Sequence, residues 1–330
     1  MYQLRTAVKI TQSSGQTTLI PILAEATITR SFDVQTQTAK VILPRNIKYN
    51  NKYIYEGDEA LVKRGDKIEL YAGYAPNLDL LFSGYISKIN NNVPIELLCE
   101  DEMFLLKQTI IKNLTFPNPK IKPPYTLKKL LDIILPSTIK HEELDCELGK
   151  IRINEASCGK VLQVLRNDYG LYSYFKDSIL YVGLPFQKQL AQTQVFLFER
   201  QMITDGMDLK YLKKDDVRVQ IKGIIIGDDN KRTEYIYGDS DGDLRTIFQY
   251  GGTKADLDVK ANSFLTQMNY TGYYGSFTTF LIPSVTPGDY AVIDSYQYPE
   301  RKGTYLIKSV ETTFGSNGGR QKIELERKIE

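Results

Sequence analysis

Short stretches in which apolar and polar residues alternate cover the first hundred positions of the chain. Residues 67–72, Lys-Ile-Glu-Leu-Tyr-Ala, alternate as a strand with one buried face does. Residues 81–89 and 93–100 continue the pattern on either side of Asn90-Asn91-Asn92, a suitable hairpin turn because asparagine tolerates left-handed backbone geometry. We expect further strands at residues 17–22, 26–31 and 39–43. This spacing predicts a small antiparallel barrel or sandwich.

The hydrophobic period becomes helical in the middle of the chain. Thr126 stands where an N-cap belongs, and the apolar face after it ends at Pro136 and consists of Leu127, Leu130, Leu131 and Ile134. A second helix is predicted from Ser157 to a C-cap glycine, Gly170. Residues 171–175 and 178–183, joined by Lys176-Asp177, predict a hairpin. Together these elements indicate a small α+β unit.

From Val217 the pattern returns to strands, interrupted by one helix. Thr253 caps that helix, and its predicted buried face consists of Leu257, Ala261, Phe264, Leu265 and Met268. The predicted fold class is mainly β with an α+β middle, made of two similar small antiparallel β-barrels and a helix-hairpin domain. The predicted domains are a first barrel (1–103), a middle domain (104–203) and a second barrel (204–330) with a helix inserted at about 253–268.

The two β regions resemble each other in the order of their motifs. Each has a Gly-Asp turn, a strand, a glycine-led strand and an Ile-Glu-Leu strand. Glycine supplies a positive φ for such a turn, and aspartate can bond the backbone amides near it. We therefore predict a duplicated barrel whose structural glycines and aspartates are Gly65, Asp66, Gly288, Asp289, Gly303 and Gly315.

Composition narrows the class of protein. The 23 tyrosines, with no tryptophan, favour a β-rich protein that makes contacts. A formal net charge of +2 provides no polycationic face, so specific nucleic-acid binding is not expected. No apolar run approaches the roughly 18 residues of a membrane span, and residues 1–9 lack the apolar core of a signal peptide. The three scattered cysteines indicate reduced thiols rather than disulfides or a zinc site.

Two short motifs suggest ligands but fit better as structural features. Arg64-Gly65-Asp66 has the letters of a cell-adhesion tripeptide, yet it lies at a strand entry that the second Gly-Asp pair repeats. The run from Asp239 to Asp243 resembles a calcium loop. Counted from Asp239, however, Leu244 and Tyr250 occupy the positions where an EF-hand requires glycine and glutamate. An acidic surface loop is the better interpretation.

The sequence offers no catalytic constellation, and we predict no enzyme activity, cofactor or metal. A Ser-His-Asp or Cys-His hydrolase would depend on the single histidine, His141, for which a surface position is expected. The Gly-x-Ser-x-Gly motif and the phosphate-binding glycine loops are absent. A pair of carboxylates is the one mechanism left open, because spacing in sequence says little about spacing in space.

The C-terminal stretch resembles phage tail and baseplate hub proteins, a family that includes the late control D proteins and the tail proteins of Mu-like phages. The resemblance rests on the glycine-rich run 270–277, Pro287-Gly288-Asp289, the strand Gly303-Thr304-Tyr305-Leu306-Ile307 and the run Phe314 to Gly319. Residues 157–183 are similar to the helix-hairpin unit of the family. The hub part of type VI secretion spike proteins is related. Those proteins continue into an oligosaccharide-binding fold and a needle, whereas this sequence stops at Glu330, so a separate spike protein is expected.

The resemblance implies a structural role. Hub proteins of this family carry two similar barrels, and three chains form a ring that adapts a six-fold tail tube to a three-fold spike. The implied partners are a homotrimer, the tail tube protein, the spike protein and other baseplate proteins. The implied location is the virion tail or baseplate, assembled in the bacterial cytoplasm. Two alternatives are a peptidoglycan-degrading tail enzyme with a carboxylate pair, and a carbohydrate- or receptor-binding tail module whose tyrosines stack on ligands.

Overall fold

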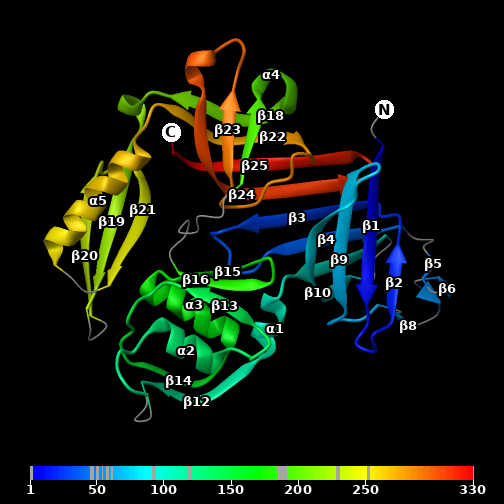
Figure 1. The fold of residues 1–330 in the computed structure, drawn as a ribbon, viewed down its shortest axis with the longest axis horizontal. Coiled ribbons are helices and arrows are strands. Elements are labelled where there is room, and N and C mark those ends of the chain that lie inside the picture. Colours follow the sequence, from blue (N-terminus) through cyan, green and yellow to red (C-terminus); the bar gives the residue numbers. More distant parts are fainter. Residues whose placement is uncertain are drawn as a thin grey trace.

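The computed structural model of the chain describes residues 3–44, 48–49, 52–53, 55–56, 59–60, 62–90, 94–117, 121–183, 192–227, 231–250 and 253–329. Within these residues a 13-stranded sheet contains strands from both ends of the chain, and smaller sheets lie between them in sequence. Figure 1 shows the N-terminal strands in blue beside the C-terminal strands in red, with the middle of the chain in two separate lobes.

The N-terminal part of the large sheet curls around a core of its own. The predicted strand at residues 67–72 forms, and both Ile68 and Leu70 are fully buried in this core, as expected. The Asn91-Asn92 part of the predicted hairpin turn lies outside the described residues, but the strands on its two sides do pair antiparallel. The strands are β1 (Leu4–Thr11), β2 (Thr17–Ile20), β3 (Glu25–Ser31), β4 (Thr38–Leu43), β9 (Lys67–Tyr74), β10 (Asp79–Asn90) and β11 (Ile95–Glu100). Two small pairs join β5 (Lys48–Tyr49) to β6 (Lys52–Tyr53) and β7 (Tyr55–Glu56) to β8 (Glu59–Ala60).

The C-terminal part of the sheet encloses a second core, in which Phe196, Phe277 and Tyr305 are fully buried. Of the predicted strand at residues 290–293, the alternating members Ala291 and Ile293 point into this core, as expected. The elements are β17 (Thr193–Leu197), α4 (Phe198–Gln201), β18 (Met202–Leu212), β22 (Gly272–Phe280), β23 (Tyr290–Asp294), β24 (Gly303–Gly315) and β25 (Gly318–Lys328).

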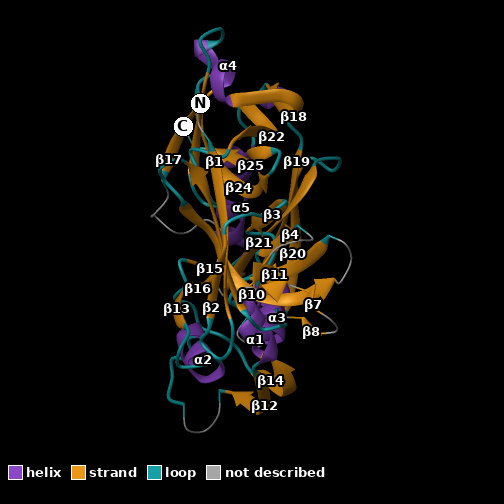
Figure 2. Ribbon diagram, turned by 90° about the vertical axis from the view of Figure 1, so that its right-hand side faces the viewer, coloured by secondary structure: helices purple, strands orange, loops and turns teal. Residues whose placement is uncertain are grey.

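The middle unit contains both predicted helices and the predicted hairpin. The Thr126 hydroxyl caps the first helix and the Ser157 hydroxyl caps the second, which ends at Gly170 with a φ of 64°. The short helix α1 (Met103–Gln108), the strand β13 (Lys140–Glu143) and the two-stranded sheet of β12 (Ile110–Phe116) with β14 (Ile151–Ser157) were not predicted. Figure 2 places α2, β12 and β14 at the end of the molecule opposite α4. The elements are α1 (Met103–Gln108), β12 (Ile110–Phe116), α2 (Leu127–Ile134), β13 (Lys140–Glu143), β14 (Ile151–Ser157), α3 (Cys158–Tyr169), β15 (Tyr172–Lys176) and β16 (Ile179–Gly183).

A second lobe is inserted between β18 and β22. It consists of a three-stranded sheet of β19 (Val219–Ile226), β20 (Arg232–Gly238) and β21 (Asp243–Tyr250), covered by α5 (Lys254–Met268). The predicted face of α5 packs on this sheet: Leu257, Ala261 and Met268 are buried, and Phe264 and Leu265 are partly buried against the same core. A capping box at Thr253 and Asp256 fixes the start of the helix.

The predicted fold class, mainly β, is confirmed, but the prediction of two closed barrels is wrong for the described residues. Among the described residues no sheet closes on itself, and the two curled parts form one open path from β18 to β2. The physical reason is the position of β3. Its outer edge pairs with β24, a strand of the other half, so the edges that would close each barrel join the halves instead.

Truncating the buried face of α5 should destabilise the inserted lobe. Leu257 is fully buried in the core of this lobe, and its side chain occupies the space that a Cβ at Gly223 would need, so Leu257→Ala should cost about 2–5 kcal/mol of unfolding free energy. Val259 on the same helix is 72% exposed, and Val259→Ala should change stability by less than about 0.5 kcal/mol. Urea unfolding of both variants measures the difference, and equal losses would show that α5 does not pack as described.

Candidate functional site

The Gly65-Asp66 turn is built by a set of four hydrogen bonds. The Gly65 amide donates to the Ile86 carbonyl at 2.8 Å, and the Ile86 amide donates to the Asp66 carbonyl at 3.0 Å. The Asp66 amide donates to the Lys63 carbonyl at 3.2 Å, while the Asp66 carboxylate accepts from the Lys63 amide at 2.8 Å. Gly65 has a φ of +95°, and Asp66 is buried. The turn therefore fixes the start of β9 against the middle of β10.

The Gly288-Asp289 turn repeats all four bonds. The Gly288 amide donates to the Ile307 carbonyl at 2.9 Å, and the Ile307 amide donates to the Asp289 carbonyl at 2.9 Å. The Asp289 amide donates to the Thr286 carbonyl at 3.1 Å, and its carboxylate accepts from the Thr286 amide at 2.8 Å. Gly288 has a φ of +91° and Asp289 is buried. The two turns predicted from sequence are therefore equivalent in structure.

The strands around the turns are equivalent as well. The first repeat has the order β3-β4-β11-β10-β9 and the second has the order β18-β22-β25-β24-β23, with every neighbour antiparallel. A register shift follows Ile86 in β10, before Lys88, and another follows Ile307 in β24, before Ser309. A bulge at the same place in two strands marks an internal repeat. The outer flanks differ, because β1 is antiparallel to β9 whereas β17 is parallel to β23.

The remaining predicted glycines serve close packing. Gly303 is the first residue of β24, where a side chain would meet the Tyr305 hydroxyl at 2.8 Å. Gly315 ends β24, where a side chain would meet the Ala24 carbonyl at 2.3 Å. The tripeptide containing Gly65 is a turn, as predicted, and the Asp66 side chain in it is buried.

One strand pair, β24 with β3, joins the two repeats. The equivalent strands, β10 and β18, have no described partner strand at the corresponding edges. Residues 309–315 of β24 pair antiparallel with residues 25–31 of β3, beyond the point where β23 ends. In the first repeat β9 covers β10 only as far as Tyr85, and no described strand pairs with residues 87–90 on that side. In the second repeat β18 pairs with β22 alone among the described strands. These edges could not be predicted from the sequence, because pairing between distant strands leaves no local signal.

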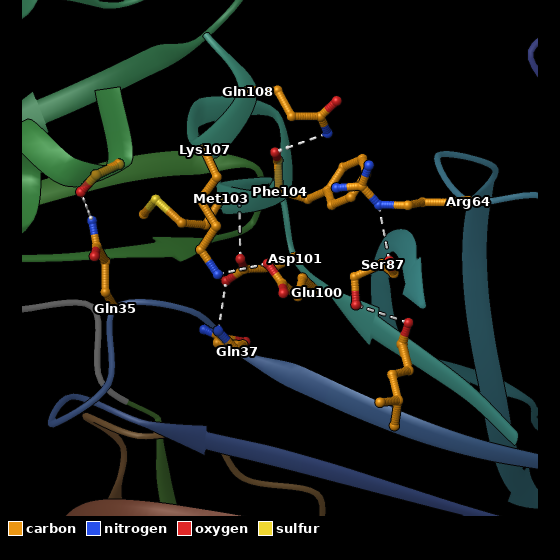
Figure 3. Close-up of polar contacts among 12 residues, drawn as sticks. Gln35, Gln37, Arg64, Ser87, Glu100, Asp101, Met103, Phe104, Lys107 and Gln108 are labelled. Atoms are coloured by element: carbon orange, nitrogen blue, oxygen red, sulfur yellow. Dashed lines mark hydrogen bonds and ion pairs between the residues drawn. The ribbon is translucent and has the colours of Figure 1, made fainter. Parts of the chain in front are cut away.

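The first repeat is tied to the middle unit by a buried carboxylate, Asp101, which no sequence motif indicated. Asp101 accepts hydrogen bonds from the Gln37 amide and the Met103 amide, both at 3.0 Å, and so holds the start of α1 against the β3–β4 turn (Figure 3). The Gln35 side chain donates to the Gly159 carbonyl at 2.8 Å, and the Gln37 side chain donates to the Phe175 carbonyl at 2.7 Å. Burial raises the pKa of Asp101 to about 7.

A cavity of about 570 Å³ lies where the two repeats and the middle unit meet. Its walls include Arg30, Asp101, Tyr174 and Asp289. Arg30 is 8% exposed, and burial lowers the pKa of its guanidinium to about 10, so the side chain stays protonated at neutral pH. Of the charged groups in its walls, Asp101 accepts from the Gln37 and Met103 amides and Asp289 accepts from the Gln192 and Thr286 amides, so both carboxylates hold backbone in place.

The other candidates from the sequence have structural contacts. His141 is less exposed than predicted, because its two ring nitrogens lie 2.8 Å from Glu143 and 3.1 Å from Asp132, linking β13 to α2. Asp239 pairs with Arg218 at 3.2 Å, next to the start of β19, and Asp243 pairs with Arg245 of its own strand, β21, at 3.1 Å. The described residues contain no cluster that could hold a metal ion, and none of the described helices is long and apolar enough to cross a membrane. The three cysteines are unpaired.

Replacing either turn glycine, Gly65 or Gly288, by valine should lower the free energy of unfolding, and the two losses should differ. Both positions need a positive φ, which costs a β-branched residue on the order of 1–3 kcal/mol. A side chain at Gly288 would also lie 3.0 Å from Phe32, whereas one at Gly65 meets nothing within 4 Å. Gly288→Val should therefore lose more unfolding free energy than Gly65→Val. Chemical denaturation of the two variants measures both losses. Unchanged stability in both would show that the positive φ at these glycines does not strain a valine.

Asp101 should make stability fall as pH rises. The folded protein keeps this proton up to about pH 7, whereas the unfolded chain releases it near pH 4, so raising pH through that window favours unfolding. The contribution can reach about 4 kcal/mol at most. Asp101→Asn cannot titrate and should lose this slope. Urea unfolding between pH 4 and 8 tests the difference between the two proteins, and parallel profiles would contradict it.

The fold of this chain is similar to that of several proteins of known structure. Neither a scan against protein-family models nor a search of curated proteins finds a match. Among solved structures, the chain is similar to a tail protein from Neisseria meningitidis MC58, with a TM-score of 0.59 and 13% identity over 100% of this chain and 97% of that one. It is also similar to the 43 kDa tail protein of prophage MuSo2 from Shewanella oneidensis, with a TM-score of 0.56 and 14% identity over 98% of each chain.

A third similar structure is an E. coli component of the type VI secretion system, itself described as similar to the bacteriophage T4 tail proteins gp27 and gp5. It has a TM-score of 0.55 and 9% identity over 94% of this chain and 74% of that chain. At these identities the likeness concerns the fold, and it agrees with the resemblance found in the sequence. The chain has the fold of phage tail hub proteins.

Proposed function

We propose that this protein is a structural hub of a bacteriophage tail or a related contractile injection device, and not an enzyme. The observation that carries the proposal is the internal repeat: two five-stranded units with the same strand order, the same turn bonds and the same bulge. The fold shared with tail proteins supports the same role. The domain boundary at residue 103 remains part of the proposal, whereas a boundary at residue 203 would fall inside β18, so the second β unit is proposed to begin with β17.

A repeat of this kind suits a symmetry adapter. Three chains with two similar units each would present six similar sheets to a six-fold tail tube and a three-fold face to a spike. The proposed partners are therefore two further copies of the chain, the tube protein, the spike protein and neighbouring baseplate proteins. The proposed location is the tail or baseplate of the particle, after assembly in the bacterial cytoplasm.

Sedimentation velocity over a wide concentration range tests the oligomeric state. We expect a monomer–trimer equilibrium, weak in isolation because tube and spike are missing. A dimer that stays stable at all concentrations would rule out the ring.

The same preparation should release neither reducing sugar nor peptide from cell walls. Turnover that disappears when one aspartate or glutamate is replaced would establish the enzyme alternative.

A further inference from the structure

The contact that joins the two repeats within the chain is an antiparallel strand pair between β24 and β3. At this junction Ser309 pairs with Ser31, Val310 with Arg30, and Glu311 with Thr29. The first partner of each pair lies on β24 of the second repeat, and the other lies on β3 of the first. The counterpart of β24 is β10, and the counterpart of β3 is β18. Both counterparts are open at the corresponding edge among the described strands.

The turns and bulges fix the equivalent residues of β10 and β24. Ile86 and Ile307 each exchange two backbone bonds with a Gly-Asp turn, so they are equivalent. The bulge that follows each of them makes Lys88 equivalent to Ser309. The next two positions of β10 therefore correspond to the next two of β24, namely Ile89 to Val310 and Asn90 to Glu311.

The same procedure aligns β18 with β3. Leu98 and Glu324 pair with the equivalent residues Lys88 and Ser309, and their own partners on the next strand are Lys40 and Ser276. Lys40 pairs with Thr27 and Ser276 pairs with Asp208, which makes Asp208 equivalent to Thr27. The positions that follow on β18 then correspond to those on β3: Lys210 to Thr29, Tyr211 to Arg30 and Leu212 to Ser31.

We propose that the open edge of β10 in one copy pairs antiparallel with the open edge of β18 in the next copy, in the register of the internal junction. Lys88 would face Leu212 of the next copy, Ile89 would face Tyr211, and Asn90 would face Lys210. The inference rests on the proposed trimer and adds the residues that join it. Because the two edges differ, the contact is head-to-tail, and such contacts close into a ring when the rotation per copy divides a full turn.

The side chains at these edges suit the pairing. In the internal junction Val310 is fully buried and Arg30 is 8% exposed, so the middle pair lies on the inner face. Its counterparts are Ile89, which packs partly against the first core, and Tyr211, which packs partly against the second. Isoleucine opposite an aromatic ring is a favourable cross-strand pair. The neighbouring Lys210 is exposed on the outer face, as Thr29 is in the junction.

Cysteine cross-linking tests the register. The variant Asn90→Cys with Lys210→Cys should form disulfides between copies under mild oxidation, because paired strands bring Cα atoms within disulfide range. Glu311→Cys with Thr29→Cys is the matched positive control, since it places the same pair at the internal junction and should close within one chain. Asn90→Cys with Leu212→Cys is the off-register control and should cross-link at least 10-fold more slowly. A Cys146→Ser background removes the one half-buried native thiol.

The outcomes separate the two proposals. A ladder of covalent dimer and trimer that ends at the trimer supports both the register and the ring. A trimer in native mass spectrometry, with the Asn90-Lys210 pair no faster than the off-register pair, overturns the register and leaves the hub function standing. Cross-linked chains that extend without closing support the edge pairing and contradict the ring. A protein that neither associates nor cross-links at its highest soluble concentration overturns both. Unfolding of each reduced variant beside the parent confirms that the substitutions leave the fold intact.

Discussion

The pairing of β24 with β3 is the contact on which the rest of the structure depends. It connects residues 309–315 to residues 25–31 and thereby turns two curled five-stranded units into one sheet. The middle unit and the α5 lobe are inserted in the connections between strands and contribute no strand to that sheet. A ladder of backbone bonds fixes the orientation of the two cores more strictly than apolar contact alone, since a shift of one residue would turn every side chain to the other face.

Features with a local physical cause could be predicted from the sequence. The Thr126 and Ser157 caps and the positive φ at Gly170 follow from side-chain oxygens and a missing Cβ, and the helices begin and end there. The same holds for the Gly-Asp turns, whose aspartates bond amides three positions earlier. The duplication was recognisable because these turns need particular residue types.

Long-range pairing could not be predicted, and neither could the alignment of the repeats in detail. The sequence suggested that Gly84, in the glycine-led strand of the first repeat, is equivalent to Gly303 in the second. Because Ile86 is equivalent to Ile307, however, the residue equivalent to Gly84 is Tyr305. The two Ile-Glu-Leu motifs are likewise displaced by two positions, since Leu97 and Ile323 occupy the same place. A displacement by two residues leaves every side chain on the same face of the sheet, so the alternation of apolar and polar residues in the sequence cannot reveal it. The β12–β14 pair was missed because the two strands are far apart and only half-buried.

The β24–β3 junction also determines when the chain can finish folding. Its partners lie near opposite ends of the sequence, so a growing chain has β3 long before β24 leaves the ribosome. During that interval the edge of β3 that will pair with β24 lacks this partner, and an unpaired strand edge can pair with another chain. The same strand pair formed between two copies would be a domain swap, because each copy would supply the strand that the other one needs. The two cores can therefore be joined only when nearly the whole chain has been made.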